Sequence, residues 1–480
     1  MRESEIVIGL EVHAELSTKT KIYCGCPNTF GGKPNTRVCP VCMGLPGTLP
    51  VLNENAVEYA VKAGHAMNCR INNLSHMARK NYIYPDLPKA YQISQWEVPL
   101  CENGYIDVVT EGRLKRIRIN RIHIEEDAGK LMHDENHNCS LADFNRCGVP
   151  LIEIVSEPDM RSSSEAKAYL ETIKMILKYL RISDCKMQEG SIRCDVNVSV
   201  REKGSTELST RCEMKNVNSF SAAVRAIEYE AKRQIEIYNA GGCIEQETRR
   251  WDDAKGMSFV MRTKENAQDY RYFPEPDIPC VYVSEATSAK LKESIPELPN
   301  EKIWRYMQDF GFSQTEAELI AEDAERAGLL DESVKLGICS PKSIQSRILS
   351  DIAKYQNDTG LKISEIPVTP EKLCFLISAS DRGIISTTSS KKAFFIMAET
   401  GEDPDKIIKE YAMEQDSDRD SLLEIANEVI SENEKSVSDY RSGKKNALGF
   451  LIGQCMKKSK GKANPVLMNK IVAELLTETD

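Results

Sequence analysis

Residues 6–16, IVIGLEVHAEL, constrain the possible folds of this chain more than any other segment. Apolar side chains occupy every second position from Ile6 to Leu16, and this period of two predicts a half-buried β-strand. The opposite row carries Glu11, His13 and Glu15. A solvated face would account for this row, and so would a site built from carboxylates and an imidazole. The strand alone leaves both explanations open.

The composition excludes several classes of protein. Of the 480 residues 41% are hydrophobic, which is enough for roughly three domains with cores of their own. No apolar run approaches the ~18 residues of a membrane span, and MRESEIVIGL resembles neither a secretion signal nor a transit peptide. Because the 16 cysteines are mostly dispersed, we expect a cytoplasmic protein with no membrane partner. The net charge of −10 restricts contact with nucleic acid to a local basic patch.

One group of cysteines is clustered. Cys24, Cys26, Cys39 and Cys42 form a C-x-C-x12-C-x2-C pattern around a loop rich in glycine, proline and asparagine. Redox chemistry would need only one of the two pairs. Four thiolates can complete a tetrahedral shell around one ion and leave no position open for water. The spacing therefore predicts a structural Zn²⁺ in this loop.

Two strands in the middle of the chain are expected to form a hairpin. Residues 191–201 and 209–218 alternate as the first strand does, and a short loop with Gly204 joins them. A surface hairpin commonly carries mixed charges, so the pattern alone does not identify a site. The charged and amide side chains of its outward face are Arg193, Asp195, Asn197, Arg211, Glu213 and Lys215.

The segment RIHIEEDAGK, residues 121–130, departs from regular alternation. The apolar phase set by Ile117 and Ile119 slips, and Ile122 and Ile124 then share a face with Glu126. A carboxylate that continues an apolar row costs free energy unless it is paired or binds a cation. Glu126 is therefore a candidate ligand.

The order of elements predicts an α+β fold. Residues 162–180 and 220–242 have apolar side chains at helical spacing, and strands and helices mix without regular alternation. We predict an N-terminal mixed α/β domain with the zinc-binding loop over residues 1–293, here called the cradle domain. All-α domains are expected to follow, a helical domain over 294–410 and a tail domain over 411–480. Proline-marked SIPELPNE and the charged spacer EQDSDRDS mark the two boundaries.

Several familiar nucleotide and hydrolase motifs do not occur. The sequence contains no G-x-x-x-x-G-K-[ST], G-x-G-x-x-G, G-x-S-x-G or H-E-x-x-H. If the chain uses ATP, a structure other than a P-loop must hold the phosphates.

Longer segments carry a family resemblance. In chain order they are IGLEVHAEL, RKNYIYPDLPKAYQISQ, IHIEEDAGK, FNRCGVPLIEIVSEPDMRS, QEGSIRCDVNVSVR, CEMKNVNSF, QETRRWD and DYRYFPEPDIP. In this order and spacing they closely resemble the GatB family, the B subunits of the aspartyl/glutamyl-tRNA(Asn/Gln) amidotransferases. The resemblance covers essentially the whole chain. The extra domain of the related archaeal Gln-specific subunit has no counterpart here.

The resemblance implies an ATP-dependent reaction on a misacylated tRNA. The side-chain carboxylate of Glu-tRNA(Gln), of Asp-tRNA(Asn) or of both would be activated as an acyl phosphate and then amidated by ammonia. It also implies two partners in the same complex, an amidase subunit that makes the ammonia from glutamine and a small third subunit. The absence of a Gly-Ser-Ser amidase motif from this chain agrees with that division.

The resemblance also implies roles for the polar strand faces. Phosphoryl transfer needs Mg²⁺ held by carboxylates, and cations around the phosphates. Magnesium is expected at Glu11, His13 and Glu126, and Mg-ATP at Glu11, Glu126 and Asp195. Glu213 is a further candidate beside Asp195. The cations expected to neutralise phosphate or orient the substrate carboxylate are Lys80, Arg193 and Lys215.

The end of the chain reverses the sign of its charge. Residues 435–470 contain nine basic residues and one acidic residue, a net charge of +8. A solvated helical surface would explain this, and so would a surface that contacts tRNA phosphates, which the resemblance favours. The lysines expected to bind tRNA are Lys457, Lys458, Lys460 and Lys462.

Two other functions are open from the residues alone. A free-standing ATP-dependent ligase for a small carboxylate would use the acidic strand faces, but it would not need the long helical half or the basic tail. A zinc-bearing RNA-binding scaffold would use the tail, but it would leave Glu11, Glu126 and Asp195 without a role.

Overall fold

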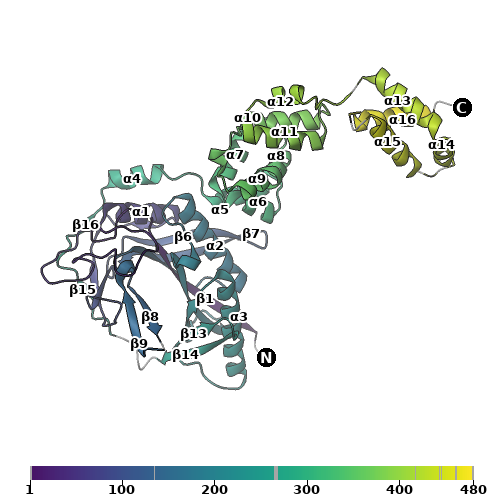
Figure 1. The fold of residues 1–480 in the computed structure, drawn as a ribbon. Helices are drawn as coiled ribbons and strands as arrows, with labels where there is room; N and C mark the ends of the chain where they lie inside the picture. The colour runs from purple at the N-terminus through teal and green to yellow at the C-terminus, as the bar shows by residue number, and fades with distance from the viewer. Residues whose placement is uncertain are drawn as a thin grey trace. The chain divides into compact units, whose positions relative to one another are not determined.

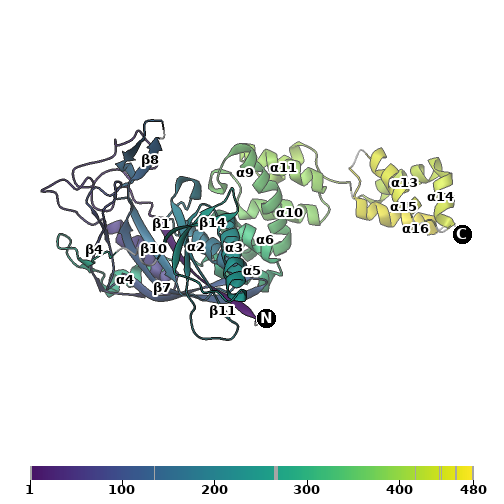
Figure 2. The ribbon, with the colours of Figure 1, turned by 90° about the horizontal axis from the view of Figure 1, so that it is seen from below.

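The computed structural model describes residues 3–134, 136–263, 269–416, 418–442, 444, 446–459 and 462–477. The chain divides into two compact units, Met1–Trp304 and Arg305–Asp480, and helix α5 (Pro299–Phe310) crosses the boundary. Strands and helices build the first unit and helices the second (Figures 1 and 2), which confirms the predicted α+β class. None of the described helices combines the length and apolarity that crossing a membrane requires.

A nine-stranded sheet forms the body of the first unit. Within the described residues its order is β14-β13-β12-β11-β1-β10-β7-β6-β2. All neighbours are antiparallel except β12 and β13. The strands are β1 (Ser4–Glu15), β2 (Arg70–Ile71), β6 (Cys101–Thr110), β7 (Arg113–Glu126), β10 (Pro150–Ser156), β11 (Ile192–Glu202), β12 (Cys212–Val217), β13 (Glu247–Asp252) and β14 (Met257–Thr263).

The sheet confirms three predictions from the sequence. The first predicted strand is β1, at the centre of the sheet between β10 and β11. The predicted hairpin is the antiparallel pair β11 and β12. The phase slip of β7 is a β-bulge, because Val155 lies opposite Arg121 whereas the next residue, Ser156, lies opposite Ile119.

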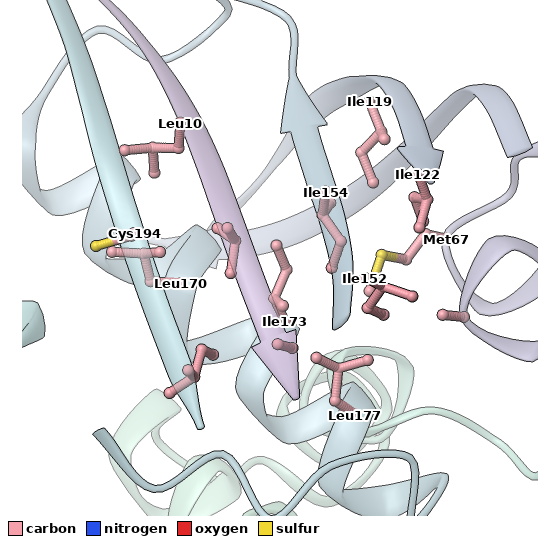
Figure 3. Close-up of a cluster of buried hydrophobic side chains, with 14 of the residues drawn as sticks. Leu10, Met67, Ile119, Ile122, Ile152, Ile154, Leu170, Ile173, Leu177 and Cys194 are labelled. Carbon is pink, nitrogen blue, oxygen red and sulfur yellow. The ribbon is translucent and has the colours of Figure 1, made fainter. Parts of the chain in front are cut away.

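Helices cover one face of this sheet, and the apolar row of β1 packs against them. These helices include α1 (Glu54–Ala66), α2 (Ser163–Tyr179) and α3 (Phe220–Asn239). The last two confirm the predicted helices, and the hydroxyls of Ser162 and Ser219 cap them. Figure 3 shows the resulting core. It labels Leu10 from β1, Cys194 from β11, Ile152 and Ile154 from β10, and Leu170, Ile173 and Leu177 from α2. Since the even-numbered row of β1 is buried there, Glu11 and His13 project from the other face of the sheet.

Short strands and one helix complete the first unit. One small sheet has the order β15-β4-β5, and two ribbons pair β16 with β3 and β8 with β9. The bounds of these elements are β3 (Leu74–Ser75), β4 (Ala78–Asn81), β5 (Tyr91–Ser94), β8 (Lys130–Asp134), β9 (Cys139–Asp143), β15 (Phe273–Pro274), β16 (Val281–Tyr282) and α4 (Glu285–Glu293).

The second unit is helical throughout its described part. Buried residues between Leu422 and Leu476 form a hydrophobic core of their own. The division into domains at residues 293 and 410 stays a prediction. The helices are α6 (Gln314–Ala321), α7 (Ala324–Lys335), α8 (Pro341–Arg347), α9 (Ala353–Thr359), α10 (Pro370–Asp381), α11 (Thr387–Thr400), α12 (Pro404–Glu410), α13 (Arg419–Glu432), α14 (Glu434–Arg441), α15 (Asn446–Lys458) and α16 (Pro465–Thr477).

Candidate active site

The register of the sheet gathers polar side chains on the face opposite the helices. His13 of β1 pairs with Glu153 of β10 on one side, and Glu153 pairs in turn with His123 of β7. On the other side of β1, Glu11 pairs with Asp195 of β11. Directly paired residues of neighbouring strands point to the same face, so carboxylates and imidazoles from separate strands converge.

These side chains line a cavity of about 460 Å³. Its walls come from the sheet, from the segment around β4 and β5, and from Tyr270 and Tyr272. The residues that the sequence predicted and that line this cavity are Glu11, His13, Lys80, Asp195, Glu213 and Lys215. Glu11 and His13, from the polar row of β1, thus line a cavity of the structure.

The first acidic group in the cavity consists of His13, Glu125 and Glu153, whose possible ligand atoms all lie within 4.8 Å of one another. The Nε2 atom of His13 is 3.5 Å from carboxylate oxygens of both glutamates. Burial disfavours the charged imidazolium, but Glu153 and Glu125 outweigh it and raise the pKa of His13 to about 9. Burial and then Glu153 raise the pKa of Glu125.

The second acidic group consists of Glu11, Asp195 and Glu213, again with ligand atoms within 4.8 Å. Asn197 donates to Glu11 Oε1 at 3.0 Å. Burial, followed by the neighbouring carboxylates, raises the pKa of Glu11. Lys215 Nζ lies 2.5 Å from Asp195 and 2.9 Å from Glu213. Burial opposes the charge of Lys215, but these two carboxylates outweigh it and raise its pKa. Each acidic group therefore concentrates negative charge that a divalent cation would offset.

The cavity also presents cations and aromatic rings. Lys80, Arg121 and Arg211 line it, and no carboxylate of the described residues lies within 4.0 Å of their charged nitrogens. The indole of Trp96 is stacked on Tyr272, with ring centroids 4.4 Å apart. Trp96 is 46% exposed, and the guanidinium carbon of Arg121 lies 5.3 Å from the centroid of its ring, so aromatic and cationic groups adjoin in this wall.

The structure does not bring Glu126 into either acidic group. Both of its carboxylate oxygens lie 2.5 Å from Lys89 Nζ, and one accepts from the backbone N–H of Ile93. Glu125 and not Glu126 therefore belongs to the candidate metal cluster. Arg193 lies outside the cavity lining as well, where its guanidinium donates to Asp127 at 2.7 Å.

Among the carboxylates and imidazoles that line the cavity, sequence reasoning missed Glu125, Glu153 and His123, and it assigned no role to Arg121, Arg211 or Trp96. The phase of Glu126 with Ile122 and Ile124 was interpreted correctly, but both faces of β7 are buried at this end of the strand, so phase could not separate the two carboxylates. A usable signal existed in β10, because PLIEIVS places Glu153 on the row opposite Ile152 and Ile154.

The four clustered cysteines meet at a second place in the first unit. The sulfur atoms of Cys24, Cys26, Cys39 and Cys42 all lie within 4.8 Å of one another, a set that can hold a metal ion. Hydrogen bonding with Cys24, together with the backbone of Cys39, lowers the pKa of Cys42 to about 4. Four sulfur donors in two close pairs suit Zn²⁺.

The predicted tRNA-binding lysines belong to the second unit. Lys457, Lys458 and Lys462 are exposed, whereas Lys460 lies outside the described residues. Lys458 pairs with Glu428 at 2.9 Å and with Glu432 at 2.7 Å, so part of its charge is already offset.

Comparisons with known proteins agree with this geometry. The family model of the GatB/GatE catalytic domain matches residues 6–289, which include the cavity and the cysteines, and the family model of the GatB domain matches residues 329–476. The B subunit of the aspartyl/glutamyl-tRNA(Asn/Gln) amidotransferase of Caldicellulosiruptor bescii is 55% identical over 477 residues, 99% of each chain. The proteins of the same name from Thermoanaerobacter sp. strain X514 and Clostridium tetani are 54% and 49% identical over 99% and 98% of each chain. The chain therefore belongs to the GatB family, the B subunits of the aspartyl/glutamyl-tRNA(Asn/Gln) amidotransferases.

Proposed function

We propose that this cavity activates the side-chain carboxylate of a misacylated tRNA, Glu-tRNA(Gln), Asp-tRNA(Asn) or both, at the expense of ATP. Transfer of the γ-phosphoryl group leaves ADP and an acyl phosphate, and ammonia then displaces inorganic phosphate to give the amide of Gln-tRNA(Gln) or Asn-tRNA(Asn). The observation that carries the proposal is the meeting in one cavity of two acidic groups and three cations that make no ion pair with any described residue. Phosphoryl transfer needs this combination.

The acidic groups suit magnesium. Glu125, Glu153 and His13 would hold one ion, and Glu11, Asp195 and Glu213 could hold a second or contact Mg-ATP. Carboxylate oxygens are the ligands that Mg²⁺ prefers, and because imidazole is an unusual ligand, His13 would act through water. When bound, the ion supplies positive charge to the phosphoryl group that is transferred.

The remaining walls suit the nucleotide and the substrate carboxylate. Lys80, Arg121 and Arg211 can neutralise phosphate oxygens or orient the carboxylate, since no carboxylate of the described part of the chain pairs with them. Burial opposes the charge of Glu213, but Lys215, held between Asp195 and Glu213, outweighs it and lowers the pKa of Glu213 beside the same space. The exposed part of Trp96 can contact an adenine ring.

The proposal requires partners. The names of the relatives describe one subunit of an amidotransferase. We propose that the source of ammonia is an amidase subunit of the same complex, and that a small third subunit braces the pair. The basic tail would contact the body of the tRNA, and the four cysteines would hold a structural Zn²⁺.

The decisive experiment measures tRNA-dependent ATP cleavage by the chain assembled with both partner subunits. Glu125→Gln and Glu153→Gln should each lower its rate by roughly a hundredfold or more, because charge that holds the ion is lost. Glutamine hydrolysis by the amidase should persist at a basal level. Glu97→Gln, an exposed residue outside the cavity lining, should retain the wild-type rate.

Other outcomes would identify the alternatives. If the wild-type complex cleaves ATP equally well without charged tRNA, the site is that of a ligase for a small carboxylate. If it binds tRNA but never cleaves ATP, the chain is an RNA-binding scaffold.

A further inference from the structure

A buried lysine lies beside the four cysteines. The side chain of Lys21 is fully buried, so it cannot extend to water as lysines usually do. Its Nζ lies 3.7 Å from Cys42 Sγ and 3.5 Å from the carbonyl oxygen of Phe144. No carboxylate within the described part of the chain lies within 4.0 Å of this nitrogen. Burying an ammonium is unfavourable unless an anion compensates its charge, so Lys21 needs a negative partner.

The sulfur of Cys42 meets the requirements for that partner. Besides Lys21, the backbone N–H of Cys39 points to Cys42 Sγ at 3.2 Å. The carbonyl oxygen of Cys39 also lies 3.5 Å from this sulfur, and the two donors that point to the sulfur favour the charge of a thiolate. The other three sulfur atoms of the cluster lie within 4.8 Å of it.

The charge of a filled metal centre explains the arrangement. Four thiolates around one divalent ion carry a net charge of −2, which is itself costly next to a protein interior. A cation at Lys21 would reduce this charge to −1. Gly148 lies beside both side chains at φ +76°, a backbone conformation that favours glycine, and a Cβ there would make ordinary van der Waals contact, 3.7 Å from Lys21 Cδ and from Cys42 Cβ.

We infer that Lys21 is the counter-cation of the four-cysteine centre and positions Cys42 as a ligand of a divalent, sulfur-binding ion. Lys21 contacts a ligand and not the metal, and it takes no part in the proposed phosphoryl transfer. The inference about Lys21 can therefore be tested independently of the activity proposed for the cavity.

Lys21→Met tests the charge, since methionine retains a long unbranched side chain and removes the ammonium. In the full chain, zinc affinity measured by competition with a chromogenic chelator should fall by roughly 10- to 100-fold, as for other residues that orient metal ligands. Lys19→Met, two residues away and exposed, should bind zinc as the wild type does. The cobalt-loaded Lys21→Met chain should keep the sulfur-to-metal charge-transfer band of four thiolates.

Three results would overturn the inference. They are unchanged zinc affinity in Lys21→Met, an equal loss in Lys19→Met, and a wild-type chain without zinc. If Lys21→Met does not fold, Lys21→Gln replaces it, because its amide can still donate to Phe144 but carries no charge. Circular dichroism establishes that each variant is folded before its affinity is interpreted.

Discussion

Two adjacent carboxylates on β7 show how strongly the surroundings decide the role of a residue. Glu125 lies on the same face of the sheet as His13, with β10 between their two strands, and it has no lysine as an ion-pair partner among the described residues. Glu126, in contrast, forms an ion pair with Lys89. Both are nearly fully buried. The first is therefore available to a cation in the cavity, and the second contributes to stability.

Glu126→Gln and Glu125→Gln should consequently differ in what they impair. Glu126→Gln should lower the free energy of unfolding by about 3 kcal/mol, because it leaves the charge of Lys89 uncompensated in a buried site. It should still bind Mn²⁺, used as a probe for Mg²⁺. Glu125→Gln should lose Mn²⁺ binding. Denaturant titration and electron paramagnetic resonance measure the two effects, and loss of Mn²⁺ from Glu126→Gln alone would reverse the assignment.

His13 predicts a pH dependence. Its pKa of about 9 in the folded protein lies above the ordinary value of 6.5, because Glu153 and Glu125 outweigh the effect of burial. A raised pKa means that the proton stabilises the folded state fully below about pH 6.5, and this contribution is lost as the pH rises through about 9. In magnesium-free buffer, the difference in unfolding free energy between wild type and His13→Gln should shrink over that range. A constant difference would show that the proton on His13 does not stabilise the fold.

At the scale of elements, the alternation of apolar and polar residues predicted the strands of the candidate site more completely than it predicted the individual residues that could bind a metal. The strand β1, the hairpin β11–β12, the helices α2 and α3 and the bulge of β7 all follow from local periodicity. The strand order does not, because it depends on pairings between distant segments. Without that order, Glu153 could not be placed beside His13. Sequence alone therefore identified the central strand of the site and missed its neighbours on β7 and β10.

In the cysteine loop, the spacing of the four cysteines alone predicted that their sulfur atoms meet. The metal content of this loop can be measured directly. The chain purified without added metal should contain about one zinc ion. Cys39→Ser should lose most of it and unfold at a lower temperature, because the loop loses a ligand. Cys139→Ser changes an exposed cysteine outside the cluster and should keep the metal. Metal analysis and thermal unfolding give the answer, and equal zinc in both variants would exclude a four-cysteine site.

For the whole molecule, the distribution of charge matters more than its sum. The chain carries −10, yet residues 435–470 carry a net +8. An acidic protein that binds an RNA must present its cations locally, since the rest of its surface repels phosphate. The exposed lysines at the end of α15 and after it meet this requirement.

Replacing Lys457, Lys458, Lys460 and Lys462 by alanine should weaken tRNA binding and flatten its dependence on salt. Each lost phosphate contact removes up to about one unit from the slope of log affinity against log salt. Lys458 should contribute least, because Glu428 and Glu432 already pair with it. ATP cleavage at saturating tRNA should persist.

A charge-matched control replaces four exposed lysines of the same unit, Lys335, Lys342, Lys391 and Lys406. This variant should keep the wild-type slope in filter-binding or anisotropy titrations. If the two variants lose affinity equally, the tail is no more than one part of a general electrostatic background.

The central place of β1 in the sheet has a consequence for folding during synthesis. The strand Ser4–Glu15 acquires its two neighbours only when residues 150–156 and 192–202, much later in the chain, have been made. Pairings over such sequence distances close slowly, and a strand with two open edges is prone to aggregate. A polypeptide released by the ribosome before residue 192 would thus be prone to aggregate and would have no partial activity. We expect the nascent chain to depend on chaperones until β11 emerges.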